Sequence, residues 1–168
     1  MARTGPAEVT VRAEPLGYEA VAYYDRVMDR TLSVLRAQPG AQVSPPAHWG
    51  VYVFSSQPEI DVVIHAPHPI YYTYSDLMAA QAFQGSRARA LFVAGAHRHA
   101  SGNSPPIADV ARYVPSVFND IHCSTLTALD PRAVIQFQWL RKHGPVGPHR
   151  TRHSQHRQPD PVGRAHEG

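Results

Sequence analysis

The chain has 168 residues, of which 43% are hydrophobic and 17% are charged. This composition suits one packed domain of ordinary size and excludes a wholly disordered chain. No apolar run of about eighteen residues is present, and the N-terminal residues lack the apolar core of a secretory signal, so we expect a cytoplasmic protein without a membrane span. Because Cys123 is the single cysteine, an internal disulfide and a cysteine-based zinc module are also excluded.

The positive charge is concentrated at the C-terminal end. Residues 141–168 hold six Lys and Arg residues, five of the eleven histidines and only two acids. Prolines recur there and no apolar periodicity is left. We therefore expect an α/β domain over residues 1–140 and a disordered, basic, His/Arg/Pro-rich tail over residues 141–168.

Seven segments carry the patterns of regular structure. Apolar residues at three- and four-residue spacing predict an amphipathic helix over residues 17–37, which Pro39 and Gly40 would end. Further helices are predicted over residues 75–84 and 114–129. Short runs of β-branched and other apolar residues predict four strands, over residues 50–54, 61–65, 90–94 and 133–137.

The last three predicted strands alternate with the last two predicted helices. Strands this apolar are typical of a parallel sheet that is covered on both faces. The sequence therefore predicts a three-layer α/β/α domain with a mostly parallel sheet. Ligands in such sheets bind beyond the carboxyl ends of the strands.

Polar side chains gather where these three strands end. They are His65 and His68 at the end of the first strand, His97, Arg98 and His99 at the end of the second, and Gln136 and Gln138 at the end of the third. Imidazoles and carboxylates that converge on one point can hold a divalent metal with a position left open for water. Arg98 could instead hold a substrate carboxylate through a bidentate pair. We assign catalysis to Arg98, and substrate binding to Arg98, His97 and Asp109.

Several of these candidates have a purely structural alternative. His65 ends a buried strand and could be a hydrogen-bonded core histidine. Arg98 could pair with Asp109 for structure alone. His68 lies between two prolines in a loop, which makes a packing role harder to argue for it.

The other histidines are weaker candidates for a functional role. We expect at most one of His97 and His99 to point to a shared site. His122 falls in a predicted helix, where we expect it at the surface.

Five stretches carry a resemblance to a known family. They are VIHAPHP at residues 63–69, AGAHR at 94–98, DVA at 109–111, SVF at 116–118 and VIQF at 134–137. In this order they resemble bacterial zinc hydrolases with the N-formylglutamate amidohydrolase and zinc-carboxypeptidase type of fold. The resemblance covers about residues 60–137, which is under half of the chain.

The resemblance implies a phosphorylase/hydrolase-like three-layer domain that holds zinc. A zinc-bound water would attack the amide or peptide carbonyl of a small-molecule or peptide substrate, and a carboxylate would act as general base. It implies that His68 is the first metal ligand. Asp76 or His65 would supply a second.

The expected third ligand is missing from this sequence. The resemblance implies a His-Gly-Phe turn after the last strand, whereas this chain has Gln138 followed by Trp139 and Leu140. One extra base in the codon of Gln138 would produce this change, so we interpret the chain as truncated or frameshifted after Phe137 and incomplete at its C-terminus. Zinc binding should then be weak, and a Gln138→His change should improve it.

The sequence thus predicts a metal-dependent amide or peptide bond hydrolase, inactive if its last ligand is lost. The alternative is a non-enzymatic α/β domain whose basic tail binds an acidic partner or nucleic acid. The tail has no aromatic residues on which bases could stack, which argues against nucleic acid.

Overall fold

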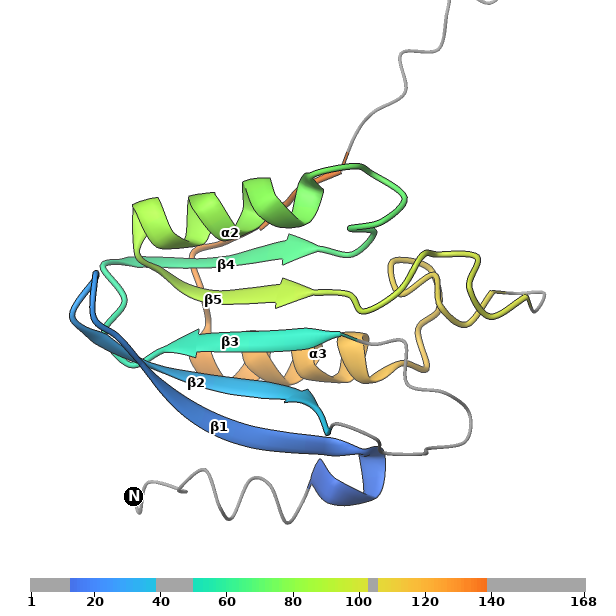
Figure 1. The fold of residues 1–168 in the computed structure, drawn as a ribbon, viewed down its shortest axis with the longest axis horizontal. Helices are drawn as coiled ribbons and strands as arrows, with labels where there is room; N and C mark the ends of the chain where they lie inside the picture. Colours follow the sequence, from blue (N-terminus) through green and yellow to red (C-terminus); the bar gives the residue numbers. More distant parts are fainter. Residues whose placement is uncertain (1–12, 39–49, 103–105, 139–168) are drawn as a thin grey trace, which may run out of the picture.

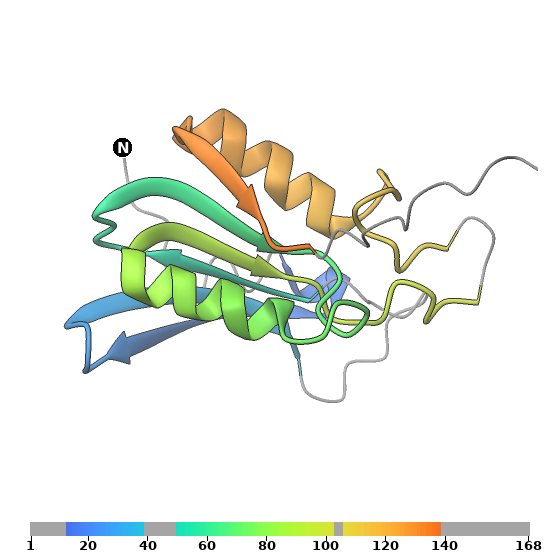
Figure 2. The same ribbon diagram turned by 90° about the horizontal axis from the view of Figure 1, so that it is seen from above.

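The computed structural model of the chain describes residues 13–38, 50–102 and 106–138. These residues form one six-stranded mixed sheet with a helix on each face (Figures 1 and 2). The elements in chain order are the short 3-10 helix η1 (Glu14–Leu16), β1 (Tyr18–Asp25), β2 (Arg30–Ala37), β3 (Val51–Ser55), β4 (Ile60–Ala66), α2 (Ser75–Ser86), β5 (Ala88–Val93), α3 (Val117–Leu129) and β6 (Ala133–Gln136).

The predicted helix over residues 17–37 is wrong, because this segment is the β-hairpin of β1 and β2. The Asp25 carboxylate accepts hydrogen bonds from the backbone N–H groups of Val27 and Met28, and Asp29 takes a positive φ of 49°, so the chain turns back on itself. The apolar spacing that suggested a helix ran across this turn. The segment becomes a hairpin because β2 pairs with β3. This partner strand lies outside the segment, so the local apolar pattern does not indicate it.

The sheet is mixed, with the strand order β1-β2-β3-β5-β4-β6. The pairs β1/β2, β2/β3 and β3/β5 are antiparallel, and only β4/β5 and β4/β6 are parallel. The chain is therefore α/β, as predicted, but the mostly parallel three-layer arrangement is wrong. The reason is the hairpin, which together with β3 adds three antiparallel strands to one side of the parallel part.

The later elements match the predictions closely. The helices predicted over residues 75–84 and 114–129 are α2 and α3, and the four predicted strands are β3, β4, β5 and β6. Helix α3 starts at Val117, where the Ser116 hydroxyl accepts a hydrogen bond from the Asn119 N–H and so caps the helix. The predicted tail over residues 141–168 lies outside the described residues.

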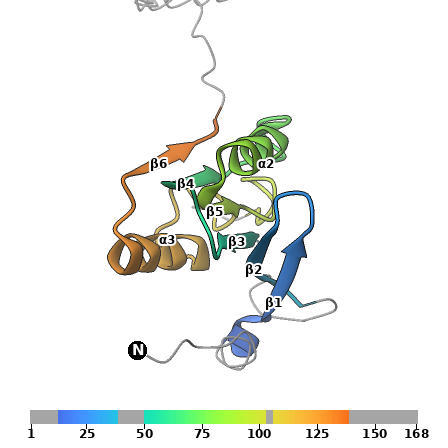
Figure 3. The same ribbon diagram turned by 90° about the vertical axis from the view of Figure 1, so that its left-hand side faces the viewer.

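Strand β4 lies at the centre of the parallel part. The chain passes from β4 through α2 to β5 on one side, and from β5 through α3 to β6 on the other, with the two helices on opposite faces (Figure 3). Successive side chains of a strand point to opposite faces. Accordingly Val63 packs in the cluster with Phe118 of α3, whereas Ile64 packs in the cluster with Phe83 of α2. No helix of the described part is long and apolar enough to cross a membrane.

Glycine at position 50 is required by the backbone. Gly50 has a φ of +91°, and a Cβ there would lie 1.8 Å from the carbonyl oxygen of Val93. We expect Gly50→Ala to lower the free energy of unfolding by about 3 kcal/mol or more. Gly85 in α2 is the matched control, because a Cβ there meets no atom within 4 Å, so Gly85→Ala should stabilise the protein by roughly 0.5–1 kcal/mol.

Chemical denaturation of the two variants beside the parent protein measures both values. Equal stability of the Gly50→Ala protein and its parent would show that the chain does not enter β3 with this backbone conformation.

Candidate functional site

The end of strand β4 places His68 inside the protein. The strand runs to Ala66, and Pro67 and Pro69 then hold the chain in a turn in which the Tyr72 N–H donates to the His68 carbonyl oxygen. The Tyr72 ring also packs edge-on against the His68 imidazole, with 5.6 Å between ring centroids. His68 is consequently only 2% exposed.

Asp109 joins three segments that are distant in the sequence. His68 Nε2 lies 2.7 Å from one carboxylate oxygen of Asp109, and Arg98 Nη2 donates to the other. His68 follows β4, Arg98 follows β5, and Asp109 precedes α3. The structure thus brings His68 and the turn at residues 95–98 together at one sheet edge, as expected from the parallel strands. It also contains the Arg98–Asp109 pair that we considered from the sequence.

The surroundings of Asp109 and His68 determine the ionisation states of these two side chains. Burial raises the pKa of Asp109, but the hydrogen bonds from His68 and Arg98 and the charge of Arg98 outweigh this, so the net pKa lies below its usual value. Burial is also the largest influence on His68 and, with the charges of Arg98 and Arg112, lowers its pKa in spite of Asp109. The pair is therefore a carboxylate and a neutral imidazole at neutral pH.

These ionisation states determine the tautomer of His68. A carboxylate only accepts hydrogen bonds, so His68 Nε2 carries the proton and donates it to Asp109. The lone pair then lies on Nδ1. This nitrogen is buried and has no hydrogen-bond partner within the described residues. The imidazole therefore offers a free lone pair that could accept a proton or bind a metal ion.

A pocket of about 610 Å³ opens beside this cluster. Arg98, Asp109, Arg112 and Tyr113 contribute to its wall. Arg98 also lies over the ring of Tyr71, 5.3 Å from its centroid, which holds the guanidinium in place. Two arginines against one carboxylate give this pocket a net positive character, which suits an acidic ligand.

Sequence reasoning missed two features of this pocket. Arg112 and Tyr113 were not among the candidates, because they lie in an irregular segment with no recognisable spacing. Their backbone N–H groups both donate to the Asp109 carbonyl oxygen, at 2.9 and 2.7 Å. The His68–Asp109 hydrogen bond joins residues 41 positions apart, and no local pattern indicates it.

The rings of His97 and His99 both lie against Tyr71. The chain turns at this point, because the His99 N–H donates to His97 Nδ1 and the Ala100 N–H donates to the His97 carbonyl oxygen. The two rings lie 5.5 Å apart and both contact Tyr71. Of the two, His99 contributes to the wall of the pocket.

His65 lies in the aromatic core under α3. It stacks on Phe92 at 4.9 Å between centroids and meets Phe118 and His122 edge-on. Burial, with a smaller contribution from the charge of His122, lowers its pKa to about 4. The expected surface position of His122 is wrong, since this ring is half-buried against His65 and burial lowers its pKa too. Nε2 of His65 has no hydrogen-bond partner among the described residues.

The predicted metal ligands do not form a ligand set in the described part of the chain. Asp76 lies in the first turn of α2, and Gln138 follows β6 beside Ser75. No three His, Cys, Asp or Glu residues gather as metal ligands within residues 13–38, 50–102 and 106–138. A catalytic zinc site usually takes three protein ligands. Within the described residues, His68, Asp76 and His65 are not brought together as such a group.

No protein-family model, curated protein or solved structure matches this chain.

The buried imidazole of His65 makes stability depend on pH. Its pKa is about 4 in the folded protein and about 6.5 when unfolded. The unfolded chain therefore binds a proton first, and stability falls as the pH drops from about 6.5 to about 4, by roughly 3 kcal/mol from this residue. We expect His65→Phe, which keeps a stacking ring, to remove this part of the pH dependence.

Urea denaturation of the parent and the variant at about pH 7 and about pH 4.5 measures the difference. His99→Phe, at a turn where the imidazole is exposed, is the control and should keep the pH dependence of the parent. The same pH dependence in the parent and in His65→Phe would contradict the burial of a neutral His65.

Proposed function

We propose that this chain is a hydrolase domain that cleaves an amide or peptide bond in a small acidic substrate. The substrate would bind in the pocket at the carboxyl edge of β4, β5 and β6. The observation that supports this proposal is the buried row of His68, Asp109 and Arg98 beside that pocket.

The His68–Asp109 pair has the features of a general base and the group that orients it. Asp109 holds the proton on Nε2, so the lone pair of Nδ1 is available to take a proton from an attacking water. When the imidazole becomes protonated, the adjacent carboxylate stabilises its charge. Arg98 contributes by keeping Asp109 ionised. Opening of the turn around His68 would admit the water, because the imidazole is buried in this structure.

The positive pocket supports an acidic substrate. Arg98 donates one N–H to Asp109, and its Nε has no hydrogen-bond partner among the described residues. Arg112 is exposed on the pocket wall. A substrate carboxylate that pairs with Arg112 would place the rest of the molecule against Asp109 and Tyr113.

Zinc has no role in this proposal. The described residues offer one buried lone pair on His68 but not the three ligands that a catalytic zinc takes. We therefore propose a hydrolysis in which His68 is the general base. The alternative that the basic tail binds an acidic partner or nucleic acid concerns residues outside the described part of the chain.

The proposal is tested by Asp109→Asn. An amide at this position accepts or donates, so the tautomer of His68 is no longer fixed, and we expect kcat to fall by about 10²–10⁴-fold. The measurement is amine release from a panel of N-acyl amino acids and dipeptides. Asp29→Asn is the matched control, because Asp29 lies in the hairpin turn at the opposite end of the sheet (Figure 1), and it should leave kcat unchanged.

The pH profile separates a catalytic effect from a loss of folding. Because the pKa of His68 is lowered in the folded protein, the acid limb of kcat/KM should lie below about pH 6.5. Absence of amine release from every substrate in the panel, or equal kcat for Asp109→Asn and the parent, would refute the proposal.

A further inference from the structure

The topology creates a second crevice at the same edge of the sheet. Strand β4 is flanked by β5 and β6, and the two connecting helices cover opposite faces (Figure 3). In open α/β sheets, ligands bind at such a reversal of strand order, next to the helix that follows the central strand. Here that place is the gap between the carboxyl ends of β4 and β6, at the N-terminus of α2.

A cavity of about 180 Å³ occupies this place. Ser75 and Met78 line it from α2, and Phe137 and Gln138 line it from the end of β6. The Phe137 N–H donates to the His65 carbonyl oxygen at 2.8 Å, which keeps the end of β6 beside β4. The cavity does not share a residue with the Arg98–Asp109 pocket, so ligand binding here is independent of the proposed hydrolysis.

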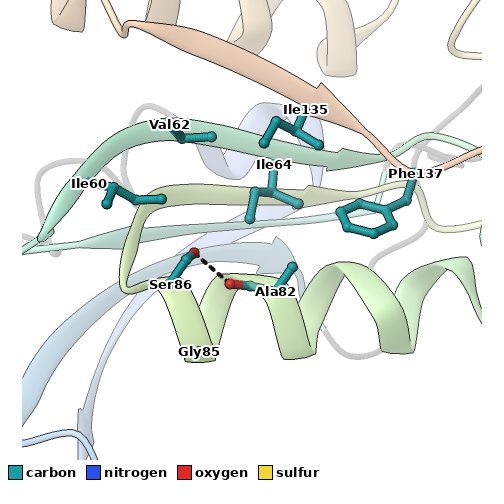
Figure 4. Close-up of a pocket in the computed structure, with 8 residues that line it drawn as sticks. All are labelled: Ile60, Val62, Ile64, Ala82, Gly85, Ser86, Ile135 and Phe137. Atoms are coloured by element: carbon teal, nitrogen blue, oxygen red, sulfur yellow. Dashed lines mark hydrogen bonds between the residues drawn. The ribbon is translucent and has the colours of Figure 1, made fainter.

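Phe137 separates this cavity from an apolar groove. The groove lies between α2 and strands β4 and β6, and Ile64 and Ile135 are among its lining residues (Figure 4). Its one polar side chain, Ser86, already donates to the Ala82 carbonyl oxygen. Among the described residues, the groove therefore offers no free side-chain donor to a polar ligand.

Ser75 is a buried polar group without a partner. Its side chain is fully buried, and its hydroxyl has no hydrogen-bond partner among the described residues. Leaving such a group unpaired costs about 1–3 kcal/mol. A buried group of this kind in a native protein calls for an explanation, such as a bound ligand.

The first turn of α2 offers further donors. No side chain caps this helix, because Tyr74 occupies the N-cap position with a φ of +67°. The N–H groups of Ser75 and Met78 donate to the carbonyl oxygens of Tyr72 and Tyr74. Those of Asp76 and Leu77 have no acceptor within the helix, and the partial positive charge of a helix N-terminus attracts anions.

We propose that this cavity binds a small oxyanion, a carboxylate or a phosphate group. The Ser75 hydroxyl and the first-turn N–H groups of Asp76 and Leu77 donate to its oxygens, and the Gln138 carboxamide closes the other side. Backbone N–H groups at a helix N-terminus are an established way to hold such groups. Met78 and Phe137 form the apolar part of the cavity wall.

The charge of Asp76 sets the expected affinity. This carboxylate follows Ser75 directly and offsets part of the helix-terminal charge, and no cationic side chain is among the residues that line the cavity in the described part of the chain. The affinity should therefore be weak, with a Kd on the order of 1 mM. Asp76→Asn should tighten binding by about two- to fivefold, because it removes a like charge.

The experiment is NMR of the full ¹⁵N-labelled chain, titrated separately with inorganic phosphate and with acetate at constant ionic strength. We expect saturable shifts of the Asp76 and Leu77 amide signals. Ser75→Ala should weaken binding by about tenfold, because a hydrogen bond to a charged group is lost. Ser124→Ala, on the exposed side of α3, is the matched control and should bind like the parent.

Each arm of the titration decides one point. Saturation by phosphate alone identifies a phosphate site, and saturation by acetate alone identifies a carboxylate site. The absence of saturable shifts with both anions overturns the proposal. It is also overturned if zinc ions alone shift these signals and Asp76→Asn abolishes that response, because the cavity then binds a cation.

Discussion

The buried carboxylate of Asp109 is the group on which the arrangement of the site depends. An ionised carboxylate inside a protein is costly unless it is paired and hydrogen-bonded. Here His68 and Arg98 satisfy one oxygen each. Removal of either partner would leave a buried charge, so the three segments that carry these residues are held in one geometry. The site is thus a rigid cluster rather than three independent loops.

The fold depends on strand β4 as the site depends on Asp109. It pairs in parallel with β5 on one side and β6 on the other, and its side chains alternate between the core under α3 and the core under α2. A single strand therefore contributes to the packing on both faces of the sheet. The hairpin β1/β2 lies at the far edge of the sheet and does not contribute to either cavity.

The two cavities at the carboxyl edge differ in their chemistry. The larger one presents guanidinium groups and the buried His68–Asp109 pair behind them. The smaller one presents a serine hydroxyl and a helix N-terminus. Both favour negatively charged groups. An acidic substrate and a small oxyanion could therefore be held at the same edge without competing for the same donors.

The sequence alone determined the elements from β3 onward. Apolar runs and helical spacing are local patterns, and they directly reflect which side chains of an element are buried. It also determined that His68 and Arg98 meet at one edge, since the carboxyl ends of parallel strands lie together. Only the tertiary structure decided that residues 17–37 form a hairpin, because β3 supplies the partner. Only the tertiary structure paired His68 with Asp109 and buried His65 under α3, because contacts between residues far apart in the sequence leave no periodic signal in it.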